Sequence, residues 1–267
     1  MALAALFVVV LAVGALVMWG LWQNALRIGS VEIVQGDQSL ATYATAAMRG
    51  AYAGIIPRDS TLFVPESAIR ARILAEHPEI AAVSIYHTGI GAIAIRADGR
   101  TAVGRWCGSA PAPDPATAGP CYLFDPGGFV YQVLPQIALA TSTATSSAPA
   151  GSAGTLNDFV LYAALAAGAQ EPLRATIASA DALPAAFDFA RRLASFGSAA
   201  TSVYVHDGEV DDALASGSRV LYILGHESDA FTALTSARAD FNLADGSVEY
   251  VDARFPGKLY VKQKASK

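Results

Sequence analysis

Four histidines, His77, His87, His206 and His226, are the side chains best suited to proton transfer or metal binding near neutral pH. They fall in different predicted elements, and none belongs to a motif such as H-E-x-x-H, which places two histidines on one helix face. His226-Glu227 is the nearest approach, but it lacks the second histidine. No G-x-S-x-G, Walker or G-x-G-x-x-G sequence occurs in the context that its chemistry requires. We therefore expect no catalytic, cofactor or metal site, and a protein that is not an enzyme.

Acidic side chains gather at Asp207, Glu209, Asp211 and Asp212, and their oxygen atoms could bind Ca²⁺. The stretch lacks the glycine and glutamate positions of a twelve-residue EF-hand loop. We interpret it as a solvated acidic loop, with calcium binding as the alternative.

The chain has two cysteines, Cys107 and Cys121, which flank a stretch rich in proline, glycine and alanine. Their spacing is not the C-x-x-C of a redox-active pair, and no nearby histidine completes a zinc site. In an oxidising compartment they would form a structural disulfide at the base of a hairpin. Closing a loop of about 15 residues contributes roughly 3 kcal/mol in the chain-entropy model.

The run from Ala2 to Trp22 carries no charged residue. As a helix rising about 1.5 Å per residue it covers roughly 31 Å, close to the thickness of the hydrocarbon core of a bilayer. Trp19 and Trp22 would then lie in the headgroup layer. A cleaved signal peptide would need a basic leader and an A-x-A site, which are absent, and a buried core helix is seldom apolar on every face. We expect a retained single-pass transmembrane helix.

The orientation of this helix depends on opposing signals. Arg27, the nearest basic residue, follows the helix, which favours a cytoplasmic C-terminal part. The length of that part and its cysteines favour the opposite. We expect the N-terminus in the cytoplasm, where a leader missing from this chain would lie, and the larger domains outside the inner membrane.

The charge balance excludes some classes of partner. A formal net charge of -5 and a pI near 5.3 argue against nucleic-acid binding, which needs clustered positive charge. The four lysines lie in the last ten residues, at Lys258, Lys262, Lys264 and Lys267. We interpret them as a solvated basic tail, with lipid or polyanion binding as the alternative.

Hydrophobic periodicity predicts a first α+β sandwich after the apolar run. A strand at 31–33 is followed by helices that begin near Ser39 and Pro65, then by alternating strands at 80–87 and 92–96. Farther along, strands dominate from Trp106 onward, with a hairpin at 121–133 around the turn 125–128. The low-complexity residues 138–155 predict a flexible insert. The other predicted elements are helices at 157–167, 185–196 and 228–241, and strands at 202–206, 219–224, 247–255 and 258–262.

This order of parts resembles the bacterial cell-division family FtsQ/DivIB. The resemblance is carried by VEIVQG at 31–36, by the stretch from Ala68 to Trp106, by YLFDPGGFVY at 122–131 and by SVEYVDARFPGKLYVK at 247–262. It covers nearly the whole chain in order. Ala97 and Asp98 depart from the family's V-x-E-R-x-P pattern, and the cysteine-bounded loop and the insert look specific to this lineage.

The resemblance implies an α+β protein with a transmembrane anchor at 1–25, a POTRA domain of β-α-α-β-β order at 26–104, and a mostly antiparallel β-rich domain with flanking helices at 105–262. A basic tail follows at 263–267. It further implies a non-enzymatic scaffold of the divisome, the cell-division machinery, located at the division septum.

The implied partners are FtsB/DivIC-like and FtsL-like single-pass division proteins and other divisome membrane proteins, with the bilayer contacted through Ala2 to Trp22. Neither nucleic acid nor a small-molecule substrate is expected. An FtsB/DivIC-type partner would add a strand to the last strand pair. The residues assigned to this contact are Tyr250, Arg254, Phe255, Lys258 and Tyr260. The alternative is a role within the domain, with Val251 and Ala253 in the core and Asp252 paired with Arg254.

Two other functions compete with the scaffold. A POTRA-bearing component of envelope export or assembly would handle unfolded clients. A membrane-tethered cell-wall hydrolase would need a nucleophile or metal set that the sequence does not offer.

Overall fold

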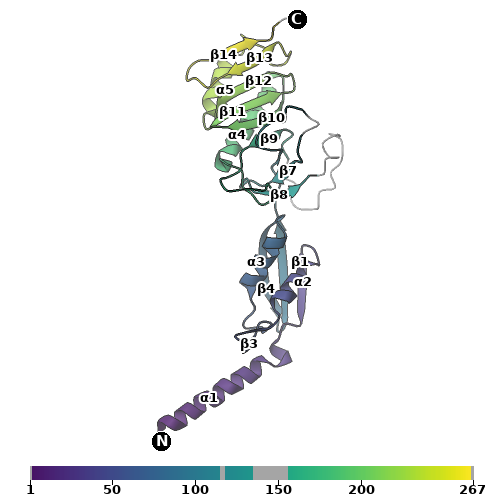
Figure 1. Ribbon diagram of the computed structural model, residues 1–267, viewed down its shortest axis with the longest axis vertical. Coiled ribbons are helices and arrows are strands. Elements are labelled where there is room, and N and C mark those ends of the chain that lie inside the picture. Colours follow the sequence, from purple (N-terminus) through teal and green to yellow (C-terminus); the bar gives the residue numbers. More distant parts are fainter. Residues whose placement is uncertain (1, 115–117, 135–155, 266–267) are drawn as a thin grey trace. The chain divides into compact units, whose positions relative to one another are not determined.

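The computed structural model describes residues 2–114, 118–134 and 156–265. The chain divides into two compact units, unit 1 from Met1 to Arg100 and unit 2 from Thr101 to Lys267 (Figure 1). The sequence-based boundary between 104 and 105 lies close to this division. The low-complexity insert predicted at 138–155 lies outside the described residues.

The first helix, α1, spans Ala2–Leu21 and is apolar on all faces. Within the described part of the chain, no helix is both long and apolar enough to cross a bilayer. Trp22 lies beyond the helix end, where its indole Nε1 donates to the Ile55 carbonyl oxygen at 2.9 Å. The predicted transmembrane helix over Ala2–Trp22 is therefore wrong, and so is the single-pass inner-membrane placement that depended on it.

Unit 1 contains a three-stranded sheet in the order β1-β5-β4, with β1 parallel and β4 antiparallel to the central strand β5. Helices α2 and α3 contact each other and pack against the sheet. Ile69 and Ile73 of α3 are four positions apart and therefore share the face that is fully buried against Ile93 and Ile95 of β5. The elements are η1 (Asn24–Leu26), β1 (Ser30–Gln35), α2 (Leu40–Ala47), β2 (Ala51–Tyr52), β3 (Ile56–Pro57), α3 (Glu66–Glu76), β4 (Ile80–Gly89) and β5 (Ala92–Gly99).

Unit 2 contains a nine-stranded sheet in the order β14-β13-β12-β11-β10-β9-β6-β7-β8. The sheet is mixed, because β6 and β9, β9 and β10, and β12 and β13 pair in parallel. The expectation of a mostly antiparallel domain missed these pairs. The elements are β6 (Gly104–Trp106), β7 (Tyr122–Phe124), β8 (Val130–Val133), β9 (Val160–Ala163), η4 (Ala180–Ala182), α4 (Leu183–Leu193), η5 (Ala194–Phe196), β10 (Ala200–His206), β11 (Glu209–Leu214), β12 (Arg219–Ile223), α5 (Glu227–Ser236), β13 (Val248–Asp252) and β14 (Tyr260–Gln263).

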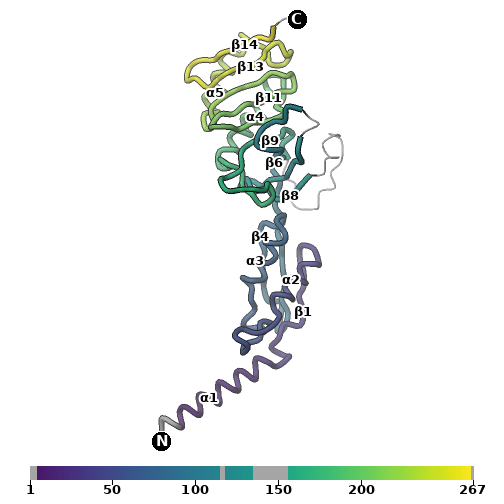
Figure 2. The backbone as a smooth tube through the Cα atoms, viewed as in Figure 1, coloured from purple at the N-terminus to yellow at the C-terminus, as the bar shows by residue number. Residues whose placement is uncertain are grey.

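Two of the parallel pairs are joined through helices. Parallel strands need a crossover connection, and α4 lies in the chain between β9 and β10, as α5 does between β12 and β13. Figure 2 follows the chain through both crossovers. Helix α4 contacts β10, α5 contacts β12, and the two helices contact each other. They cover one face of the sheet, which we call the covered face; the other is the open face.

The covered face carries a row of side chains that runs across six strands at one level. Strand register places these residues opposite one another from β9 to β14, and alternation puts them all on the covered face. We call this set the inner row: Leu161, Val203, Asp212, Val220, Val251 and Val261. One carboxylic acid therefore lies within an otherwise aliphatic row.

Two segments of unit 2 differ from their predicted structure. Residues 157–167 contain strand β9 in place of the expected helix, and residues 209–214 form strand β11 in place of a solvated acidic loop. Asp211 and Asp212 are both buried. Acidic residues are usually exposed, so the acidic composition of this segment predicted a loop where the structure has a central strand of the sheet.

Candidate partner-binding edge

Strand β14 forms one edge of the nine-stranded sheet and pairs only with β13 among the described residues. All four of its side chains are exposed. An edge strand leaves alternate backbone N–H and C=O groups without a neighbouring strand. Beyond the strand, the Lys264 N–H donates to the Ser247 carbonyl oxygen at 2.8 Å, toward the β13 side. Because successive residues face opposite sides, the backbone groups of Gln263 and Val261 point away from β13.

Exposed apolar side chains lie at this edge. Phe255 is 49% exposed and Tyr260 is 51% exposed, and their ring centroids are 5.4 Å apart in an edge-to-face contact. Val261, at the end of the inner row, is 37% exposed. An added strand could therefore bury both an aromatic pair on one side and an aliphatic residue on the other. We call Phe255, Tyr260 and Val261 the edge patch.

Arg254 is held within unit 2. Its guanidinium donates to both carboxylate oxygens of Asp252, at 2.9 and 2.7 Å, and to Oε2 of Glu209 at 2.7 Å. Asp252 is buried, and its hydrogen bonds with Arg254 hold its pKa below the ordinary value. This network ties the end of β13 to the start of β11. The guanidinium therefore supports the edge from within unit 2.

The other assigned residues flank the edge patch. Tyr250 lies in β13, with Nζ of Lys262 5.5 Å from its ring centroid and hydrogen-bonded to Glu249 at 3.0 Å. Lys258 is exposed in the turn between β13 and β14, where its N–H donates to the Phe255 carbonyl oxygen. Of the two lysines, Lys258 precedes β14 and Lys262 is paired with Glu249.

A disulfide and a tight turn stabilise the opposite end of the sheet. Cys107 and Cys121 form the disulfide between the end of β6 and the start of β7. In the turn that follows β7, Oδ1 of Asp125 accepts hydrogen bonds from the N–H groups of Gly127 and Phe129. Gly128 adopts φ +74° there. The D-P-G-G sequence is thus explained by turn geometry.

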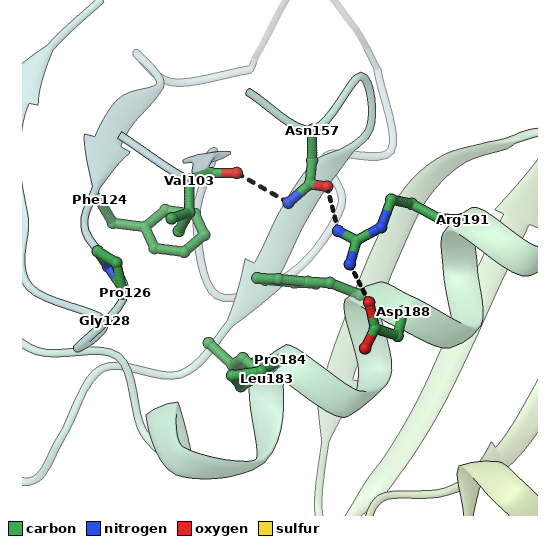
Figure 3. Close-up of a pocket in the computed structure, with 10 residues that line it drawn as sticks. Val103, Phe124, Pro126, Gly128, Asn157, Leu183, Pro184, Asp188 and Arg191 are labelled. Carbon is green, nitrogen blue, oxygen red and sulfur yellow. Dashed lines mark hydrogen bonds and ion pairs between the residues drawn. The ribbon is translucent and has the colours of Figure 1, made fainter. Parts of the chain in front are cut away.

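A hollow of about 250 Å³ lies between this turn and α4 (Figure 3). Its walls are mainly apolar, including Phe124 and Phe187. At its rim, Asn157 donates to the Val103 carbonyl oxygen at 2.8 Å and accepts from Arg191 at 2.7 Å. Arg191 also bonds to Asp188 (Figure 3). The polar groups of the rim therefore satisfy one another, and the lining residues offer no acid-base pair or nucleophile.

The four histidines lie in or beside different elements. His77 bonds to Glu79 at 2.8 Å in unit 1, whereas His206 stacks on Tyr204 in unit 2. His226 precedes α5. Across residues 2–114, 118–134 and 156–265, no group of three or more His, Cys, Asp or Glu side chains is arranged to hold a metal ion.

The sequence pattern does not identify Val261 and Gln263 as the residues whose backbone faces outward at the edge, nor Glu209 of β11 as the partner of Arg254. The alternation of Tyr260 to Gln263 could have identified Val261 as an inner-face residue. The pairing of Glu209 with Arg254 joins residues 45 positions apart and had no local signal.

Comparison of the sequence with models of known protein families and with curated proteins finds no match to either.

Proposed function

We propose that this chain is a non-enzymatic scaffold of the FtsQ/DivIB type, which assembles cell-division proteins by docking them on its two units. The observation that carries the proposal is the open edge of β14 with its exposed patch. Unit 1 adds support, because its three-stranded sheet and two helices follow one another as β1-α2-α3-β4-β5, with the short pair β2-β3 between the helices, and this is close to the arrangement expected of a POTRA domain.

The proposed binding mode is strand addition. A partner strand pairs with the outward backbone groups of Val261 and Gln263, which gives affinity largely independent of partner sequence. Specificity comes from the edge patch, where large apolar side chains can be buried. Lys258 lies exposed in the turn between Phe255 and Tyr260, so the matching strand is amphipathic and carries an acidic residue that can face this turn. This description fits an FtsB/DivIC-type partner as the family resemblance implies.

The test separates backbone pairing from side-chain contact. Val261→Pro/Gln263→Pro removes two outward N–H groups, and proline is tolerated on an edge strand where its nitrogen faces away from the sheet. The matched control, Val261→Ala/Gln263→Ala, shortens the same side chains and keeps both N–H groups. The probe is the purified C-terminal segment of the FtsB/DivIC-type protein from the same organism, and its affinity is measured by calorimetry.

Strand addition predicts that the double proline variant binds at least tenfold more weakly than the double alanine variant. Circular dichroism of both variants checks that the sheet is retained. Equal affinity in the two variants would reject strand addition, and failure of the wild type to bind would reject the division partner. Crosslinking to unfolded clients in cells, with no division protein recovered, would favour the export function instead.

A further inference from the structure

The strongest unexplained feature of unit 2 is the carboxylic acid in the inner row. Asp212 has an exposed fraction of 0%, as does Tyr222 on the adjacent strand β12. Register pairs Asp212 with Val220 and Val210 with Tyr222, so the two polar side chains lie diagonally on the covered face. Neither carboxyl oxygen of Asp212, nor the Tyr222 hydroxyl, has a hydrogen-bond partner in the structure. A buried carboxylate without a partner is strongly disfavoured.

The elements packed around Asp212 supply no cation in the described residues. On the flanking strands, His206 and Arg219 lie on the open face, and Arg219 bonds to Asp211. On α4, Arg191 bonds to Asn157 and Asp188, and the Cζ of Arg192 lies 3.5 Å from the ring centroid of Phe231. The charged residues of α5 are Glu227 and Asp229, both acidic. Tyr222 and Glu227 are the titratable groups that interact with Asp212.

Burial explains the direction in which the two groups are shifted. It raises the pKa of the Asp212 carboxyl well above its ordinary value; the Tyr222 hydroxyl opposes this shift, and the Glu227 carboxylate adds to it. Burial also raises the pKa of Tyr222, and the acidic groups nearby raise it further. Both groups are therefore most stable here in their neutral forms.

We propose that Asp212 keeps its proton in the folded protein, and that loss of this proton loosens α4 and α5 from the covered face. A neutral carboxyl needs no counter-charge in this position, whereas an ionised one has only the Tyr222 hydroxyl acting in its favour among the described residues and must be solvated. The inner row is covered by the two helices, so water can reach Asp212 only if this layer opens. The helix layer is thus a proton-sensitive element of unit 2.

The sign of the effect follows from proton binding. Because the folded state holds the Asp212 proton more tightly than the unfolded state, the contribution of Asp212 to stability is greatest at low pH and falls as pH rises above the ordinary aspartate pKa of about 3.9. The fall continues until the folded-state pKa is reached. Most carboxylates paired with a cation stabilise the folded state more as pH rises, so the contribution of Asp212 can be distinguished from theirs by its sign.

The test compares Asp212→Asn with the wild type in the full chain, between pH 4.5 and 8.5. Trp19→Phe and Trp22→Phe in both proteins leave Trp106, buried in unit 2, as the fluorescent reporter. The unfolding constant of the wild type, divided by that of Asp212→Asn, is expected to rise with pH by up to tenfold per pH unit. Other titrating groups cancel in this ratio. A ratio that stays constant or falls with pH would overturn the proposal.

A second measurement needs no folded variant. In wild-type protein with ¹³C-labelled aspartate carboxyls, one resonance is expected to keep the shift of a protonated acid above pH 6, where exposed aspartates are ionised. As that resonance titrates, amide hydrogen exchange of Phe189 in α4 and Leu234 in α5 should accelerate beyond the intrinsic dependence on pH. If every aspartate is ionised at pH 6, or if the two helices stay equally protected through the titration, the proposal fails.

Discussion

The guanidinium of Arg254 bonds to the Glu209 carboxylate at 2.7 Å, across 45 residues of chain. The same guanidinium holds the buried carboxylate of Asp252. These contacts give Arg254 a role in positioning the end of β13, and they distinguish it from Phe255 and Tyr260, whose side chains are exposed beside it. Substitutions at this edge should therefore fall into two groups.

Arg254→Ala is expected to destabilise unit 2 by about 1–2 kcal/mol at neutral pH, because a buried carboxylate loses its charged donor at a partly exposed site. The pKa of Asp252 lies below its ordinary value in the folded protein. Its stabilisation is therefore present above the unfolded-state pKa and is lost as pH falls through the folded-state pKa. Urea unfolding at pH 7 and pH 3 measures this. The variant should differ most from the wild type at pH 7; a larger difference at pH 3 would contradict the assignment.

Phe255→Ala and Tyr260→Ala are expected to leave the free energy of unfolding within about 1 kcal/mol of the wild type, since both side chains are about half exposed. Each should weaken binding of an FtsB/DivIC-type segment by tenfold or more, as aromatic residues at the centre of an interface do. Titration calorimetry and urea unfolding of the same samples separate the two effects. Leu62→Ala, an exposed apolar position in unit 1, is the control and should bind normally.

Gly128→Ala is expected to destabilise unit 2 by about 1–3 kcal/mol, because overpacking and strained backbone act together. Gly128 has φ +74°, and a Cβ there would lie 2.6 Å from the Cβ of Ala180. Gly127→Ala is the matched control, since its Cβ would make only an ordinary contact, 3.4 Å from Oδ1 of Asp125. Thermal unfolding should separate the two variants clearly, and equal melting temperatures would contradict the turn argument.

Removing the disulfide through Cys107→Ser/Cys121→Ser is expected to cost about 3 kcal/mol, because the unfolded chain regains the freedom of a loop of this length. The two cysteines are 14 positions apart. Urea unfolding with and without reductant measures the effect. Reductant should lower the stability of the wild type to that of the double variant and leave the variant unchanged.

The spacing of apolar residues predicted those parts of the fold in which buried side chains recur at the period of the local helix or strand. Strand β5, which contains Ile93 and Ile95, and the turn at Asp125 to Gly128 are of this kind. The assignment of Phe255 and Tyr260 to a partner contact rests on the family resemblance and stays a prediction.

Prediction failed where a residue type that is usually exposed is buried, or where contacts far along the chain decide the structure. Asp211 and Asp212 suggest a loop but lie in a central strand, because one bonds to Arg219 and the other faces the covered interior. The apolar composition of α1 predicted a transmembrane helix that extends to Trp22. In the structure the helix ends at Leu21, and Trp22 donates a hydrogen bond to the Ile55 carbonyl oxygen. Contacts between distant residues decide these cases, and they leave no periodic trace in the sequence.

The last strand also shields its neighbour. In β13, Val248, Val251 and Asp252 are buried, whereas every side chain of β14 is exposed. A carboxypeptidase or a premature stop codon that removes the residues from Lys258 onward would remove β14 and its lysines. Strand β13, with buried Val248 and Val251, would then become the exposed outer strand of the sheet. Such a truncated protein should self-associate, because charged side chains on outer strands normally prevent two sheets from pairing edge to edge.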